Sequence, residues 1–269
     1  MTLSSCSAGA AALRSRFIAV AGGVTGRDHR NALRDGQDGF ALVATADVTA
    51  VIVTDGCSSG ARSEVGARLG AAWLAELVSR RFAPAELVSR RFADAAPTEA
   101  ARDVTRALVR RLRVLARSIA RCDDRGRGAI DPRTVGDLLL FGFLAAVVSS
   151  THAIVFGVGD GIVWVDGRTT SIDPGPANAP AYAAYALLGA TIEPRIHHLG
   201  AARDVGAIAV ATDGADELVG PDSDPSLATL VGDDRLLANP SLLRKRLVVL
   251  SDRGRFRDDA TIGILRRAP

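Results

Sequence analysis

The sequence contains few cysteines, almost no lysine and no long apolar run. Its three cysteines, Cys6, Cys57 and Cys122, are scattered over 269 residues, so neither a disulfide framework nor a zinc knuckle is indicated. No stretch approaches the roughly 18 consecutive apolar residues that a membrane-spanning helix needs. Hydrophobic residues make up 48% and charged residues 23%, which is typical of a soluble globular protein. These absences argue against a disulfide-stabilised secreted domain and against a membrane protein.

Because Lys245 is the only lysine, arginine supplies nearly all of the positive charge behind the net charge of +3. Helical spacing over Thr98–Arg121 places six arginines along one stripe, with apolar residues on the opposing face: Arg102, Arg106, Arg110, Arg113, Arg117 and Arg121. The stripe lacks the interleaved aromatics of a nucleic-acid surface. We therefore expect no nucleic-acid partner and interpret it as a solvated helix face, with a docking surface for an acidic partner as the alternative.

The N-terminus has no basic residue before its small apolar run, which makes it a poor signal peptide. We expect residues 1–16 to be an N-terminal extension, residues 17–269 to form a single domain, and the protein to be cytoplasmic.

The order of the expected elements indicates an α+β fold. Two helices, Glu64–Arg81 and Thr98–Arg121, separate an early group of strands from a later one, and further helices start near Ala215 and at Asn239-Pro240. Short β-branched runs predict the following strands: Phe17–Ala21, Phe40–Thr45, Thr49–Thr54, Leu139–Val148, Ala153–Val158, Ile162–Val165, Gly206–Ala211 and Ala260–Leu265. This order suits packed antiparallel sheets with helices outside.

Two segments between these elements are unusual. The nonapeptide AELVSRRFA occurs at Ala75–Ala83 and again at Ala85–Ala93, which we interpret as an in-frame duplication without a functional role. Asp173–Arg195 is rich in Pro, Gly and Ala and predicts a long loop that could cover a site. His197-His198 follows it and is interpreted as a surface turn.

Three apolar strands end in an Asp-Gly pair, at Asp55, Asp160 and Asp213. Each pair alone is a common turn signal. Together they can bring several carboxylates to one rim, where two charges 4 Å apart would repel by about 4 kcal/mol at an effective dielectric near 20. Oxygen ligands without suitably spaced His or Cys favour Mg²⁺ or Mn²⁺ over Zn²⁺.

Five ordered motifs then resemble those of the type-2C metal-dependent Ser/Thr phosphatases, the PPM family. They are Gln37-Asp38, Asp55-Gly56-Cys57, Gly159-Asp160-Gly161, Thr212-Asp213-Gly214 and Arg257-Asp258-Asp259-Ala260-Thr261. The resemblance runs from about Phe17 to Leu265 and is greatest to a bacterial branch with a His, here His29, upstream of Gln-Asp.

The resemblance implies an αββα sandwich of two antiparallel sheets flanked by helices, with two Mn²⁺ or Mg²⁺ ions between the sheets. Asp55 is then expected to bridge both ions, with the Gly56 carbonyl on one of them. Asp213 and Asp258 are expected on the other ion and Asp38 near the first. Asp160 and Glu217 match positions that hold a third, weaker ion.

Three departures from the family pattern leave alternatives open. The family's Asp-Asn pair is Asp258-Asp259 here. When the two pairs are aligned, Asp258 takes the place of the ligand and Asp259 the place of the Asn. Arg30 and Arg34 compete for the role of phosphate-binding arginine, and we favour Arg34. Cys57 replaces the His that follows the first Asp-Gly in many relatives, and because no Cys-x5-Arg loop surrounds it, it is not expected to be a nucleophile.

The function implied is removal of phosphate from phosphoserine and phosphothreonine in proteins, by attack of a water that bridges the two ions. Arg34, Asp38 and Asp55 are the candidate catalytic residues, and the partner is a phosphorylated protein whose phosphate a Ser/Thr kinase added. The alternative is a catalytically silent phosphatase fold that binds a partner or senses a ligand.

Overall fold

Two five-stranded antiparallel sheets form the centre of the protein. The computed structural model describes residues 17–83, 96–122, 129–176, 179–220 and 223–268. One sheet has the order β1 (Phe17–Val24), β10 (Ala260–Arg267), β9 (Ala207–Ala211), β6 (Gly161–Val165) and β7 (Arg168–Ile172). The other has the order β2 (Gly39–Ala44), β3 (Val48–Gly56), β4 (Phe141–Ser149), β5 (His152–Val158) and β8 (Arg195–Ala201).

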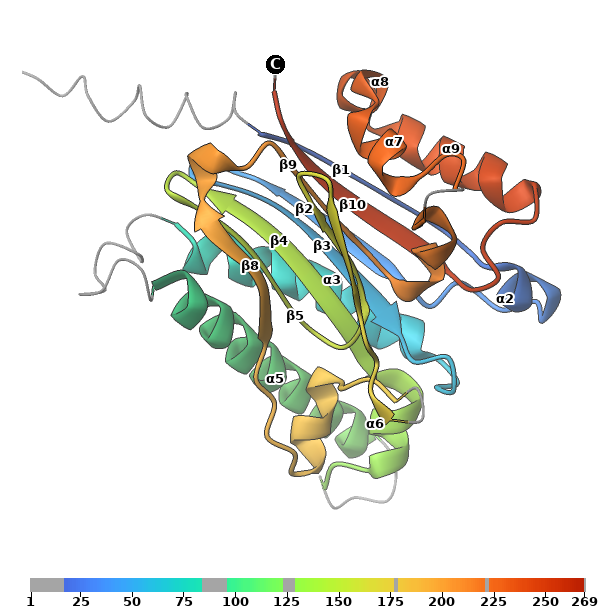
Figure 1. Cartoon of the computed structure of the whole chain (residues 1–269). Helices are drawn as coiled ribbons and strands as arrows, with labels where there is room; N and C mark the ends of the chain where they lie inside the picture. The colour runs from blue at the N-terminus through green and yellow to red at the C-terminus, as the bar shows by residue number, and fades with distance from the viewer. Residues whose placement is uncertain (1–16, 84–95, 123–128, 177–178, 221–222, 269) are drawn as a thin grey trace, which may run out of the picture.

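Helices cover the outer face of each sheet. α3 (Ser63–Arg81) and α5 (Ala96–Cys122) pack on the β2–β8 sheet, whereas α7 (Leu227–Gly232), α8 (Asp234–Ala238) and α9 (Ser241–Asp252) pack on the other (Figure 1). One apolar core fills the space between the sheets, and one lies under each helical layer. The expected αββα sandwich is therefore confirmed.

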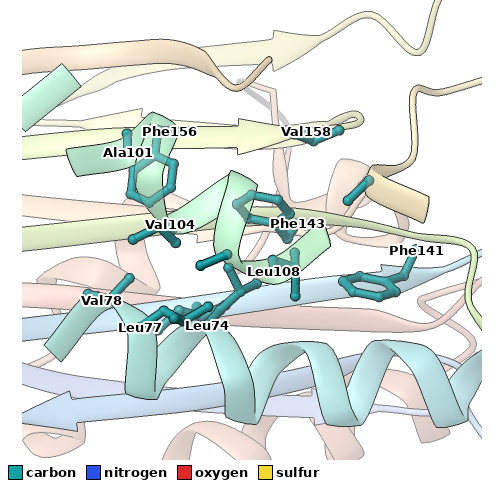
Figure 2. Close-up of a cluster of buried hydrophobic side chains, with 14 of the residues drawn as sticks. Leu74, Leu77, Val78, Ala101, Val104, Leu108, Phe141, Phe143, Phe156 and Val158 are labelled. Atoms are coloured by element: carbon teal, nitrogen blue, oxygen red, sulfur yellow. The ribbon is translucent and has the colours of Figure 1, made fainter. Parts of the chain in front are cut away.

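The core under α3 and α5 follows from the helical spacing of α5. Val104, Leu108 and Leu112 recur every four residues and are fully buried, which turns one face of the helix toward the sheet. Figure 2 shows this face meeting α3 and the aromatic rings of β4 and β5, where Phe143 and Phe156 pack edge to face with ring centroids 6.1 Å apart. Such aromatic pairs add to the stabilisation from burial itself.

Strand β3 is buried over nearly all of its length because both of its faces are covered. Val51 and Val53 point into the core between the sheets, while Ala50 and Ile52 point into the core under the helices. Side chains alternate along a strand, so Asp55 continues the inward row of Val51 and Val53. The strand thereby carries a carboxylate to the end of the space between the two sheets.

Several elements were missing from the sequence prediction. The short helix α6 (Pro132–Leu138) directly precedes the expected strand Leu139–Val148, which as β4 begins at Phe141. The N-cap of α6, Asp131, accepts hydrogen bonds from Arg133 N and Thr134 N. Strand β7 has the polar sequence RTTSI and four exposed residues, so it gave no apolar signal.

The interpretation of His197-His198 as a surface turn was wrong, because both residues lie in β8. β8 is an edge strand of mixed polarity, and its irregular pairing with β5 near Val155 disturbs the alternation that would have revealed it. The expected long loop Asp173–Arg195 contains a 3-10 helix at Ala183–Leu188.

The helix expected from Ala215 was also wrong, since Asp213–Leu218 forms a 3-10 helix. α9 begins at Ser241, one position later than an Asn239 cap would require, and Pro240 is the residue that precedes it. The first copy of the duplicated nonapeptide, Ala75–Ala83, includes the last turns of α3, which ends at Arg81. The second copy lies outside the described residues. Within the described ranges, no helix is long and apolar enough to cross a bilayer.

Arginines on α5 have local partners in the folded protein. Arg102 lies 3.4 Å from Glu99 and 3.6 Å from Glu193, and Arg106 contacts Glu99 and Asp103. These exposed contacts support the interpretation of the stripe as a solvated helix face.

Candidate metal centre

The Asp55 carboxylate is the electrostatic centre of a group of acidic residues at one end of the sandwich. Burial raises its pKa well above the ordinary value, and repulsion from four other carboxylates raises it further: those of Asp38, Asp213, Asp160 and Asp258. These residues come from four different segments of the chain. The fold therefore brings the five predicted aspartates within electrostatic reach of one another.

Asp38 lies just before β2 and is held by a hydroxyl from the opposite sheet. The Thr212 hydroxyl donates a 2.9 Å hydrogen bond to Asp38 Oδ2, whereas Oδ1 is buried without any hydrogen-bond partner. Burial raises the pKa of Asp38 well above its usual range, the nearby Asp259 adds to this, and hydrogen bonds from Thr261 and Thr212 oppose it. An anionic Asp38 thus needs a further positive partner at Oδ1.

Asp160 and Asp213 follow β5 and β9, as their Asp-Gly signals predicted. Asp160 is buried, its Oδ1 has no hydrogen-bond partner, and burial raises its pKa. The pKa of Asp213 is raised to about 6, first by burial and then by repulsion from Asp160 and Asp258. Asp213 is nevertheless exposed to solvent, which screens part of this repulsion.

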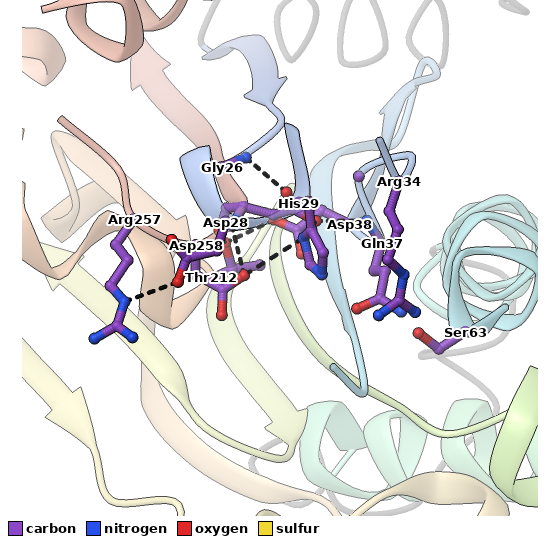
Figure 3. A network of polar contacts seen from close by, with 12 residues as sticks. Gly26, Asp28, His29, Arg34, Gln37, Asp38, Ser63, Thr212, Arg257 and Asp258 are labelled. Atoms are coloured by element: carbon purple, nitrogen blue, oxygen red, sulfur yellow. Dashed lines mark hydrogen bonds and ion pairs between the residues drawn. The ribbon is translucent and has the colours of Figure 1, made fainter. Parts of the chain in front are cut away.

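The two adjacent aspartates at the start of β10 have different surroundings. The Asp258 side chain is 54% exposed, and its Oδ1 accepts a 2.8 Å hydrogen bond from Asp259 N. The Asp259 side chain is buried, and it accepts hydrogen bonds from Gly26 N and Gln37 N. Asp258 (Figure 3) therefore has a carboxylate available to a ligand, while Asp259 is engaged with the backbone.

The carboxylate of Glu217 has partners outside the group of aspartates. Its Oε1 accepts a 3.2 Å hydrogen bond from Phe256 N, and its Oε2 lies 4.0 Å from Arg255.

The two candidate arginines point to different places. Arg34 donates to Gly60 O at 2.9 Å, in the loop that follows Asp55 and Gly56. Arg30 instead approaches Ser251 O and Asp252 at the end of α9. Of these two arginines, Arg34 is therefore the one that lies beside the loop leading from the acidic cluster.

These residues fit divalent cations such as Mg²⁺ or Mn²⁺. All donors are oxygens, and two of them, Asp38 Oδ1 and Asp160 Oδ1, are buried without a partner. The carboxylates are not closely gathered, however. In the described part of the chain, the compact group with ligand atoms all within 4.8 Å of one another is His29, Asp258 and Asp259. Binding of two ions by the aspartates would thus require small side-chain movements.

Sequence reasoning missed the residues that support this cluster. Thr212 and Thr261 belong to two of the quoted motifs, yet nothing in the sequence assigned them a role. Tyr182 was missed as well. Its hydroxyl hydrogen-bonds with the Cys57 thiol, and burial followed by this bond raises its pKa. For Cys57 itself, burial raises the thiol pKa, but hydrogen bonds with Ser59 and Tyr182 outweigh this and lower it.

Comparison with solved structures agrees with this architecture. A bacterial serine phosphatase is 14% identical, with a TM-score of 0.59 over 93% of this chain and 97% of that chain. Serine-threonine phosphatase 2C from Toxoplasma gondii is 13% identical, with a TM-score of 0.62 over 94% and 95%. Serine/threonine phosphatase Stp1 from Staphylococcus aureus is 14% identical, with a TM-score of 0.58 over 92% and 94%. At these identities the likeness establishes the fold.

The family model described as Protein phosphatase 2C matches residues 25–243, which is most of the chain. No curated protein matched the sequence. Fold and sequence together define a phosphatase of the metal-dependent type. The chain belongs to the protein phosphatase 2C family, whose members are protein serine/threonine phosphatases, and membership implies dependence on divalent metal.

Proposed function

We propose that this protein hydrolyses phosphoserine and phosphothreonine esters in proteins, with two Mn²⁺ or Mg²⁺ ions held by Asp38, Asp55, Asp213 and Asp258. The observation that carries the proposal is the position of Asp55, whose carboxylate is repelled by four others at the inner end of the sandwich. An uncompensated cluster of this kind is unfavourable, and divalent cations would offset the repulsion. The Gly56 carbonyl, at the buried end of β3, is proposed as a further ligand.

Bound divalent ions supply a water nucleophile near neutral pH and neutralise charge on the phosphoryl group. The residues of the chain would then bind and orient. Thr212 fixes one oxygen of Asp38, which leaves the other oxygen free for a cation. Arg34 lies at the exposed edge of the site, where its guanidinium could donate hydrogen bonds to two oxygens of the substrate phosphate.

A third, weaker ion is proposed at Asp160, because its buried Oδ1 has no partner. Glu217 was predicted as the second ligand of this ion. It would have to release Phe256 N to take that part. We therefore assign Asp160 the main role in a third site.

Family membership implies phosphoprotein substrates. We infer further that the substrates are phosphorylated by a Ser/Thr kinase, and that the protein acts in the cytoplasm in signalling. Because Cys57 stands where many relatives have a His, the leaving oxygen would take its proton from water or another group.

The second candidate is a silent phosphatase fold that binds a partner. Two observations favour it: the engagement of Glu217 by Phe256 N, and the spread of the aspartates beyond the compact group at His29. Hydrolysis of a phosphothreonine peptide separates the two functions. We expect turnover that requires Mn²⁺ or Mg²⁺ and stops in EDTA. Metal binding without turnover on a broad phosphopeptide panel would favour the silent fold, and activity that persists in chelator would refute the metal centre.

A further inference from the structure

Three nitrogen atoms lie close to the buried carboxylate of Asp259. Gly26 N donates to Oδ1 at 2.7 Å, and Gln37 N donates to Oδ2 at 2.5 Å. Nδ1 of His29, itself nine-tenths buried, lies 3.0 Å from the same Oδ2. A carboxylate only accepts hydrogen bonds, so it suits this position, whereas the amide group of an asparagine would turn its NH₂ toward one of the N–H donors. This explains why Asp stands where the resemblance predicted Asn.

The backbone around Asp259 has no spare room. A Cβ placed on Gly26 would lie 2.2 Å from the carbonyl carbon of Asp258, and one on Gly214 would lie 2.0 Å from the carbonyl oxygen of Asp259. The Asp258-Asp259 segment is therefore enclosed between two glycine backbones. A change in the hydrogen bonds of Asp259 would consequently be passed on to both neighbouring segments.

Both segments that Asp259 joins carry a candidate metal ligand. Gln37 directly precedes Asp38, and Asp258 directly precedes Asp259. The Gln37 side chain extends the connection, since its Nε2 donates to Gly60 O at 3.0 Å in the loop after Asp55. In the view of Figure 3, His29 lies between Asp258 and Gln37.

We propose that His29 and Asp259 form a buried pair that positions Asp38 and Asp258 for metal binding, a role that rests on the proposed function. The 3.0 Å contact between Nδ1 of His29 and Oδ2 of Asp259 fixes the carboxylate that holds the Gln37 backbone. Groups that support metal ligands in this way commonly change metal affinity by about 10-fold to 100-fold when removed.

A competing explanation makes His29 itself a metal ligand. Its Nδ1 and the two carboxylates lie within 4.8 Å of one another, which a transition-metal ion could bridge. Against it, Asp259 already accepts two backbone N–H groups, which balance much of its charge. The positioning pair therefore accounts for the geometry without an additional ion.

The test compares two variants of His29 by Mn²⁺ titration calorimetry on the full chain. His29→Leu fills the volume but has no donor. His29→Asn keeps an N–H at the place of Nδ1, because the amide nitrogen of Asn and Nδ1 of His are each bonded to Cγ. We expect a roughly 10-fold rise in the Mn²⁺ Kd for His29→Leu and near wild-type affinity for His29→Asn. The KM for a phosphopeptide should stay unchanged in both.

Asp166→Asn is the matched control for general destabilisation. Asp166, in the turn between β6 and β7, likewise accepts from two backbone N–H groups, Gly206 N and Ala207 N, but lies outside the cluster. This variant should lower the melting temperature and leave the Mn²⁺ Kd unchanged. If His29→Leu cannot be purified, Asp259→Asn tests the same pair and should also raise the Kd.

Three outcomes would overturn the proposal. Wild-type Mn²⁺ affinity in both His29→Leu and Asp259→Asn would show that the pair does not position the ligands. Equal loss in His29→Leu and His29→Asn, together with nitrogen hyperfine coupling in the Mn²⁺ EPR spectrum of the wild type, would make His29 a ligand. Absence of Mn²⁺ binding to the wild type would refute this proposal and the proposed function together. A wild type that binds Mn²⁺ without turnover contradicts only the proposed function, because the readout here is binding.

Discussion

The hydroxyl of Thr212 donates a 2.9 Å hydrogen bond to Oδ2 of Asp38, although the two residues are 174 positions apart. The same hydroxyl oxygen accepts a 3.0 Å hydrogen bond from Thr261 N. Thr212 thus connects the segment before β2 with β9 and β10, which belong to the other sheet. One small side chain couples the two halves of the sandwich at the acidic end.

Replacing Thr212 by Val should remove this connection without a change in shape. The buried Thr261 N–H and Asp38 Oδ2 would each lose a partner, which costs about 1–3 kcal/mol of unfolding free energy. Thr212→Ser, which keeps the hydroxyl, should lose much less. Urea unfolding of both variants measures the difference, and equal losses would show that the methyl group rather than the hydroxyl matters.

The metal-free protein should become less stable as the pH rises. Asp213 has a pKa of about 6 in the folded protein, above the unfolded value, so the folded state binds this proton more tightly. The stability it contributes is complete below the unfolded pKa and is lost as the pH rises through about 6. Asp38 and Asp55 act in the same direction.

Thermal unfolding of metal-stripped protein between about pH 5 and pH 7 tests this sign. We expect a lower melting temperature at the higher pH, and a smaller difference when Mn²⁺ is present because the ions replace the protons. A metal-free melting temperature that rises over this range would contradict the shifted carboxylates.

Cys57→Ser should leave most of the phosphatase activity intact. Sγ of Cys57 lies 3.1 Å from Ser59 Oγ and hydrogen-bonds with Tyr182, and a serine hydroxyl can form similar bonds. The proposed nucleophile is a water, so no thiol is needed. Steady-state kinetics should show a kcat close to that of the wild type, whereas a loss of several orders of magnitude with metals bound would assign the thiol a direct role.

Arg34 and Arg30 allow a paired test of phosphate binding. Arg34→Ala should raise KM for a phosphopeptide by roughly tenfold or more, since a charge-assisted hydrogen bond contributes about 1.5–3 kcal/mol. Arg30→Ala should leave KM unchanged, because Arg30 lies against the end of α9. A larger effect from Arg30 than from Arg34 would reverse the assignment.

The strands that carry the candidate ligands could be predicted because both of their faces are buried. β3 and β9 read as continuous apolar runs that end in Asp-Gly, and period-two alternation alone directs Asp55 inward. The αββα order followed from these runs together with the family resemblance. β7 and β8 could not be predicted in this way, because they are edge strands with exposed or half-buried residues.

The supporting contacts of the site could not be predicted from local patterns. Thr212 with Asp38, and His29 with Asp259, are pairs of residues far apart in sequence whose meeting depends on how the two sheets pack. Glu217 was predicted as a ligand from its position in the sequence, but the Phe256 N–H donates a hydrogen bond to its carboxylate in the folded protein. Sequence identifies candidate ligands, and packing decides which of them remain available.

Asp55 is proposed to lie at the centre of a shared metal site. Melting curves of the wild type, Asp55→Asn and the exposed control Asp204→Asn, each in EDTA and in saturating Mn²⁺, test this directly. In EDTA, Asp55→Asn should melt at or above the wild type, because it relieves repulsion among the carboxylates. In Mn²⁺ the wild type should gain about 2.7 kcal/mol at a hundredfold excess over Kd, as should the control, and Asp55→Asn much less. An equal Mn²⁺ gain in Asp55→Asn and the wild type would contradict the shared metal centre.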